Sequence, residues 1–191
     1  MKKVLFVAIV LAVVSKNVNA QTGSILVGGS IDFSSAKTAG ITSDTKTTNF
    51  AFSPTVGYQF NENWTAGLVA DIGSSKTTVP NVTSTTTVFD IGPFIRYAKS
   101  ISNTFAVYGQ LQGAFGTQKE NSVRSSLADI KAFPALFINF GHSFGLNFSV
   151  GGIEYNSSKP SGSSASNEFS FTFGRAVGIG ISKNFGGGKK K

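Results

Sequence analysis

The sequence contains no cysteine and only one histidine in its 191 residues. Without cysteine the chain can form no disulfide, no thiolate metal site and no lipidated N-terminal cysteine. A lone histidine, His142, with no thiolate to accompany it provides no zinc ligand set. The sequence therefore predicts no metal site and no cofactor.

Charged residues are also scarce, at 14% of the chain, against roughly 25% in an ordinary soluble domain. Aromatic residues make up 12%, and 18 of them are phenylalanine. A chain so rich in aromatics and so poor in charge is not a disordered segment. Its length is sufficient for one domain with a full core.

No stretch after residue 20 has the period of an amphipathic helix, and no glycine-rich segment follows a strand and opens a helix, which argues against a nucleotide-binding loop. Residues 1–20 resemble a secretory signal peptide: Lys2 and Lys3 precede an apolar run from Val4 to Val14, and Val18-Asn19-Ala20 is a small-residue cleavage site. The run is too short for a transmembrane helix. The alternative for this run is a buried N-terminal helix.

The net charge of +8 lies mostly at the two ends of the chain. The signal region contributes three lysines, and the segment 186–191, which we interpret as a flexible basic tail, contributes three more. Without these six lysines the remaining domain, residues 21–185, has a net charge of only +2. This argues against a nucleic-acid partner, which would need a basic face on the domain itself.

The segment 168–185 alternates strictly between two kinds of residue. Seven of its nine odd positions are large and apolar, and every even position is polar or small. Because side chains on a strand alternate between faces, this is one long strand between two different environments. It is longer than a typical strand of a globular protein and long enough to cross a bilayer at a tilt.

The same alternation occurs seven more times, which predicts an all-β, eight-stranded antiparallel up-and-down transmembrane β-barrel. In the sixth segment Phe133 and Phe137 disturb the pattern, and we expect Leu136, Ile138 and Phe140 to point outward. In the seventh we expect a bulge at Gly151-Gly152, after which the faces swap. The eight segments are about 24–34, 48–60, 64–74, 86–97, 104–116, 130–140, 145–155 and 168–185.

The connections alternate between short and long. Short turns are expected at 61–63, 98–103 and 141–144, and long loops rich in Ser and Thr at about 35–47, 75–85, 117–129 and 156–167. Short turns at one end and long loops at the other are the layout of outer-membrane barrels, with both termini on the periplasmic side.

Alternation alone leaves open whether the apolar face points outward to lipid or inward, as in a soluble lipocalin-like carrier. The second face is mostly Gly, Ala, Ser, Thr, Asn and Gln, with few of the charges that a water-facing surface carries. Aromatic residues adjoin the short turns, as in an interfacial girdle. The outward orientation is therefore favoured, with girdle residues Phe60, Trp64, Tyr97, Phe105, Phe140 and Phe185.

With its signal peptide, the strand from Phe89 to Tyr97 and a last strand ending on Phe185, the chain resembles the small eight-stranded bacterial outer-membrane β-barrels of the OmpA/OmpX type, in the outer membrane protein β-barrel domain family. The resemblance implies a location in the outer membrane of a Gram-negative cell. It also implies recognition of the last strand by the barrel-assembly machinery, although here six residues follow Phe185.

The polar face also carries charges. An eight-stranded barrel is filled by its own side chains, so charges inside it must pair. We expect a structural salt-bridge network in the lumen, the alternative being an ion path or catalytic carboxylates. Arg175 falls on the lipid face, near the outer headgroups or turned inward by a bulge near Gly174, and Lys183 lies near the inner interface, where it can snorkel. The expected lumen charges are Asp32, Asp71, Asp90, Arg96, Lys131 and Glu168.

Three classes of function remain. The favoured one is a non-enzymatic barrel that is structural or binds an extracellular ligand through four long loops. The second is a small passive pore. The third is a lipid-modifying enzyme, which is disfavoured because His142 lies in a short periplasmic turn. Outer-membrane lipid is the expected surrounding partner.

Overall fold

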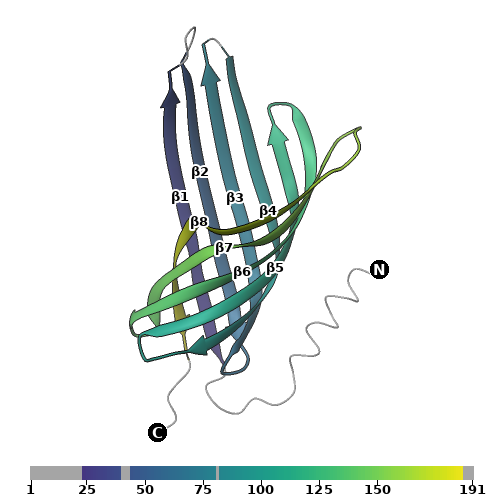
Figure 1. The fold of residues 1–191 in the computed structure, drawn as a ribbon. Helices are drawn as coiled ribbons and strands as arrows, with labels where there is room; N and C mark the ends of the chain where they lie inside the picture. Colours follow the sequence, from purple (N-terminus) through teal and green to yellow (C-terminus); the bar gives the residue numbers. More distant parts are fainter. Residues whose placement is uncertain (1–22, 40–43, 81, 187–191) are drawn as a thin grey trace.

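The computed structural model describes residues 23–39, 44–80 and 82–186, with only the backbone at 175 and 176. It is a closed antiparallel barrel of eight strands in chain order, as predicted (Figure 1). The predicted signal peptide at 1–20 and residues 187–191 of the predicted tail lie outside the described residues. The strands are β1 Ser24–Thr38, β2 Thr45–Gln59, β3 Trp64–Val79, β4 Val82–Ser100, β5 Phe105–Glu120, β6 Val123–Gly141, β7 Phe144–Pro160 and β8 Ser166–Phe185.

The barrel has two visibly different halves. Strands β1 to β4 stand upright as a tall wall, whereas β5 to β8 cross more obliquely and end lower (Figure 1). The start of β1 and the end of β8 lie together, since Ile25 pairs with Phe185. In the described residues, no helix is long and apolar enough to cross a membrane.

The four long loops that the sequence predicted are wrong in extent. Strand β3 continues to Val79 and β4 already begins at Val82, and β5 and β6 are separated only by residues 121–122. The Thr-rich ends of these strands are good β-formers because Thr is β-branched. They also stay in register with their neighbours, with Thr78 and Thr83 paired and their hydroxyls 3.3 Å apart. The segments around 75–85 and 117–129 are therefore largely paired strand, which an apolar/polar pattern alone does not detect.

Apolar side chains point out of the barrel along every strand, in the orientation that the sequence favoured. Leu68 of β3 is 55% exposed and Phe89 of β4 is 51% exposed. On the opposite face, Thr65, Val69 and Asp90 are buried. A lipocalin-like carrier would need the reverse arrangement, with the apolar side chains around an internal ligand, so this alternative is wrong.

The bulge predicted at Gly151-Gly152 is confirmed. The β7–β8 register shifts between Ser149 and Gly151, and Gly151 has φ +109°, a conformation that favours glycine. Beyond it the outward positions change from even to odd, so that Ile153 is exposed.

The outward positions predicted in β6 are consistent with the structure. Phe140 is exposed, Leu136 and Ile138 are half-buried, and Phe133, which disturbed the alternation, lines the interior.

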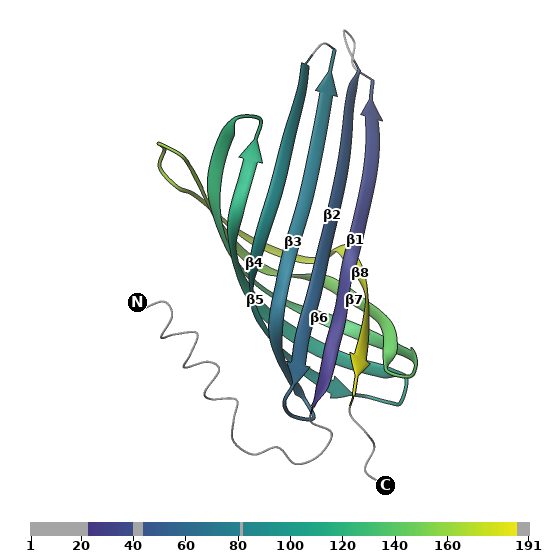
Figure 2. The same cartoon turned by 180° about the vertical axis from the view of Figure 1, so that it is seen from behind.

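The closure between β1 and β8 is short. The two strands pair only from Ile25–Phe185 to Gly29–Ile181, and above this level β8 turns away from β1 (Figures 1 and 2). The turn coincides with Gly174, at φ +73°, where β8 has extra residues relative to β7. The seam between β1 and β8 is thus the least paired contact of the barrel.

Candidate functional site: the polar lumen

Part of the lumen is filled by buried side chains. Leu26 of β1, Val69 of β3 and Phe94 of β4 form one apolar cluster, at 5%, 4% and 3% exposure. These residues occupy the inward positions of strands whose alternate residues point outward. Their burial agrees with the narrow interior of an eight-stranded barrel.

Arg96 lies in the lumen but is not part of a salt bridge. Its Nε and Nη2 donate to Gln110 Oε1 at 2.9 and 2.7 Å, and Gln110 in turn donates to Gln112 at 2.8 Å. The guanidinium also lies 4.1 Å from the ring centroid of Tyr108. No carboxylate of the described residues is within salt-bridge distance of Arg96. The amide oxygen of Gln110 and the ring of Tyr108 take the place of the expected carboxylate partner. Their role could not be predicted from sequence position alone.

Two of the expected carboxylates face each other across neighbouring strands. Asp71 of β3 is the register partner of Asp90 of β4. The hydroxyl of Ser53 donates to Asp71, whereas Oδ1 of the buried Asp90 has no hydrogen-bond partner among the described residues. Like charges directly opposite each other on adjacent strands are destabilising. Asp71 and Asp90 therefore do not form the expected contact between opposite charges.

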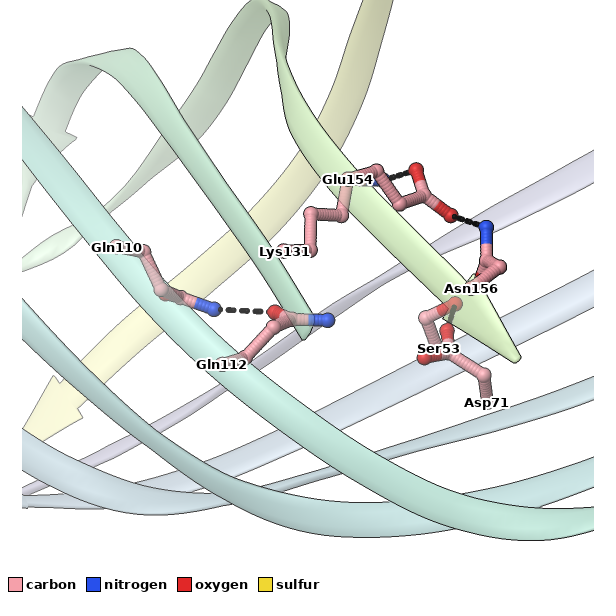
Figure 3. Close-up of polar contacts among 7 residues, drawn as sticks. All are labelled: Ser53, Asp71, Gln110, Gln112, Lys131, Glu154 and Asn156. Carbon is pink, nitrogen blue, oxygen red and sulfur yellow. Dashed lines mark hydrogen bonds and ion pairs between the residues drawn. The ribbon is translucent and has the colours of Figure 1, made fainter. Parts of the chain in front are cut away.

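Lys131 forms the one ion pair found in the described part of the lumen, with Glu154 at 3.6 Å. Glu154 also accepts a hydrogen bond from Asn156 at 2.8 Å. Figure 3 shows this group near Gln110, Gln112, Ser53 and Asp71. Sequence reasoning missed Glu154, although the swap of faces at the Gly151-Gly152 bulge places it inward.

Asp32 and Glu168 are the two remaining predicted lumen charges. Asp32 is exposed and lines the cavity, whereas Glu168 is exposed and does not line it. The cavity has a volume of about 670 Å³ and contains both signs of charge, from Asp32, Asp71, Glu154, Arg96 and Lys131. Such a lining can hold water or a small polar solute.

The aromatic residues expected in a girdle lie beside the short turns. Trp64 and Tyr97 are register partners with ring centroids 4.9 Å apart, in an edge-to-face arrangement. Phe60 is half-buried, and the other members are exposed. The exposed set is Trp64, Tyr97, Phe105, Phe140 and Phe185.

The sequence singled out two further residues, His142 and Arg175. His142 lies in the β6–β7 turn with φ +51°. The side chain of Arg175 lies outside the described part of the structure. Across the described ranges, no group of three or more His, Asp or Glu residues is arranged to hold a metal ion.

No protein-family model and no curated protein matches the sequence. Among solved structures, the fold is similar to the translocator domain of autotransporter NalP from Neisseria meningitidis, at 13% identity and a TM-score of 0.44. That match covers 96% of this chain, which spans 64% of the length of the NalP structure. The fold is also similar to the Yersinia pestis outer membrane protein Ail, at 14% identity and a TM-score of 0.33, with 86% of this chain and 99% of Ail covered. At these identities the likeness concerns the fold alone.

Proposed function

We propose that this chain is a non-enzymatic outer-membrane β-barrel protein of the small OmpA/OmpX type, which is structural or binds a surface ligand through its protruding hairpins. The support for a membrane location is the outward apolar face together with the aromatic residues at the short turns. In water, so large an apolar surface would drive aggregation. A lipid environment removes this cost.

The single observation that favours this function over a pore is the part of the lumen that buried side chains fill. Leu26, Val69 and Phe94 are almost fully buried inside the barrel, and Arg96 is held beside them by Gln110. A conducting path would need continuous water through this layer. In this proposal the cavity of about 670 Å³ does not pass through the barrel and is not a channel.

The protruding hairpins are the proposed contact surface. The outer face of β3 is apolar as far as Ile72, whereas Lys76 and Thr78 continue the same face with polar groups. The β2–β3–β4 extensions are joined by backbone pairing, so polar groups are presented on a paired sheet rather than on loops. With the termini on the periplasmic side, these hairpins lie outside the cell.

Conductance in planar bilayers tests the closed lumen. We expect the wild-type protein to give no stable single-channel openings, whereas Phe94→Ala, which removes a filling side chain, increases leakage. The exposed Phe89→Ala is the matched control on the same strand. Large, stable, ion-selective openings of the wild-type protein would instead support the alternative function, a small passive pore.

Truncation of one hairpin tests surface binding. Replacing residues 77–84 by an Asn-Gly turn leaves Lys76 paired with Thr85 and closes the shortened β3–β4 hairpin. Intact cells that carry the full or the shortened barrel are then compared for the extracellular material they retain. Equal retention by both, and by cells without the protein, would reduce the proposal to a purely structural role.

Two parts of the proposal concern biogenesis and chemistry. The barrel-assembly machinery is the proposed partner during insertion, with Phe185 as the last aromatic of β8. The protein is proposed not to be an enzyme, because His142 lies at the short-turn end, away from the outer rim where acyl transfer to surface lipid would occur.

A further inference from the structure

An apolar groove lies over the seam between β1 and β8. It has a volume of about 470 Å³, within the range of small-molecule sites. Its apolar lining consists of Val27, Ile31, Phe52, Phe144, Ile179, Ile181 and Phe185. All seven are at least about one third exposed and carry no polar group, so the groove suits an aliphatic chain.

The groove is formed by a contrast in side-chain size. Its floor contains Gly28, Gly29 and Gly180, which carry no side chain. Phe52 of β2 and Phe144 of β7 belong to the strands that flank the seam on either side. Large side chains flanking a floor of glycines leave a furrow along the strands, which in a bilayer is open to the lipid tails.

One cation lines the groove at the end next to the short turns. Lys183 is the register partner of both Val27 and Phe144, which begins β7 directly after a short turn. Its ammonium lies 5.1 Å from the ring centroid of Phe185. Among the described residues, no carboxylate is within salt-bridge distance of Lys183. The groove thus combines an apolar furrow with a positive charge at one end, both on the outer face.

We propose that this groove binds one anionic glycerophospholipid, with an acyl chain along the furrow and the phosphate at Lys183. The proposal rests on the membrane location proposed above, which places Lys183 at the periplasmic headgroup level. Lysine near a bilayer surface attracts anionic headgroups. The bound chain would also cover the seam up to Ile31 and Ile179, beyond the last paired residues Gly29 and Ile181.

Lipid retention after reconstitution tests the headgroup. The barrel is placed in vesicles of phosphatidylcholine and phosphatidylglycerol, extracted in mild detergent and weighed by native mass spectrometry. The wild-type protein should retain one phosphatidylglycerol. Lys183→Gln should retain about fivefold less, the effect of one lysine near a surface. Lys99→Gln, an exposed lysine near the same end on β4, should retain as much as the wild type.

A second pair of variants tests the furrow itself. Val27→Phe adds bulk inside the groove and should reduce retention of either lipid, while the added side chain remains compatible with the bilayer. Val56→Phe is the control, because Val56 is the β2 register partner of Val27, is exposed on the same face and does not line the groove.

Three results would overturn the proposal: equal retention by Lys183→Gln, Val27→Phe and the wild type; equal retention of phosphatidylcholine and phosphatidylglycerol; or a mass twice that of the chain without lipid, which would show that a second copy covers the seam. Failure of the membrane location is distinguishable, because the wild-type protein would then remain outside the vesicle fraction.

Discussion

Strands β3 and β4 are paired from Trp64–Tyr97 to Val79–Val82, whereas β1 and β8 are paired only from Ile25–Phe185 to Gly29–Ile181. The first contact forms a continuous wall that rises past the apolar band. The second closes the barrel near its base only. The comparison shows that this barrel closes with a short ladder at one seam while the β3–β4 contact stays continuous.

The difference has a local cause in the sequence. The polar ends of β3 and β4 consist largely of Thr, Ser and Val, which suit a pleated sheet. The seam instead contains Gly28, Gly29, Gly178 and Gly180, and Gly174 bends β8 away at φ +73°. Glycine in a strand weakens it and marks bends.

The largest expected effect is on membrane insertion through the β3–β4 wall. Leu68→Lys places a charge on the exposed apolar face, where a lysine at the bilayer midplane costs roughly 2 to 4 kcal/mol. Heat-modifiable gel migration after refolding into vesicles should show little folded barrel. Thr78→Lys, on the same face of β3 but in the polar extension, should fold normally. Equal folding of both variants would contradict the assignment of the apolar face to lipid.

A smaller effect distinguishes the tight packing of the wall strand β4 against β5 from the loose pairing at the seam. At Gly92 a Cβ would collide with the backbone of Gly113 and lie 2.6 Å from Ala114 Cα. Overpacking of this kind costs about 1 to 3 kcal/mol, so Gly92→Ala should lower the denaturant midpoint in detergent micelles. At Gly180 the nearest atom would be Gly29 O at 3.0 Å, and Gly180→Ala should cost less. The reverse order would show that the seam is the better-packed contact.

Side-chain coupling at the base of the barrel gives a third comparison. A double-mutant cycle on Trp64 and Tyr97, whose rings meet edge to face, should show a coupling of about 0.5 to 1.5 kcal/mol. The same cycle on Ile25 and Phe185, the outward pair at the seam, should show about 0.2 to 1 kcal/mol. Both are measured by denaturation with alanine substitutions, and a larger coupling at the seam would contradict the comparison.

The smallest effect on stability is expected from cysteine probes of sidedness. Thr83→Cys lies near the tip of the wall and Asn61→Cys in a short turn, and both positions are exposed. Because the chain has no native cysteine, a membrane-impermeant thiol reagent has no background. On intact cells only Thr83→Cys should react, and Asn61→Cys should react after the outer membrane is opened. The opposite pattern would invert the topology.

Sequence reasoning located all eight strands because period-two alternation is a local property of each segment. It failed at the strand ends around residues 75–85, where both faces are polar and alternation vanishes although pairing continues. From the alternation of strand positions it placed Asp71, Arg96 and Lys131 in the lumen, but it did not identify their partners. Gln110 and Glu154 belong to neighbouring strands, and their contacts depend on register and on the bulge in β7.

The sequence by itself determined the strand number and the antiparallel order, because both follow from alternation and from turn residues close in the chain. The outward direction of the apolar face was indicated by the small and polar residues of the other face and by the aromatic residues beside the short turns. Only the tertiary structure decided where β1 stops pairing with β8. The length of the paired β1–β8 ladder depends on the shear accumulated over all eight strands and on bends at Gly151 and Gly174. The groove at Lys183 follows from this closure, since its walls come from strands far apart in the sequence.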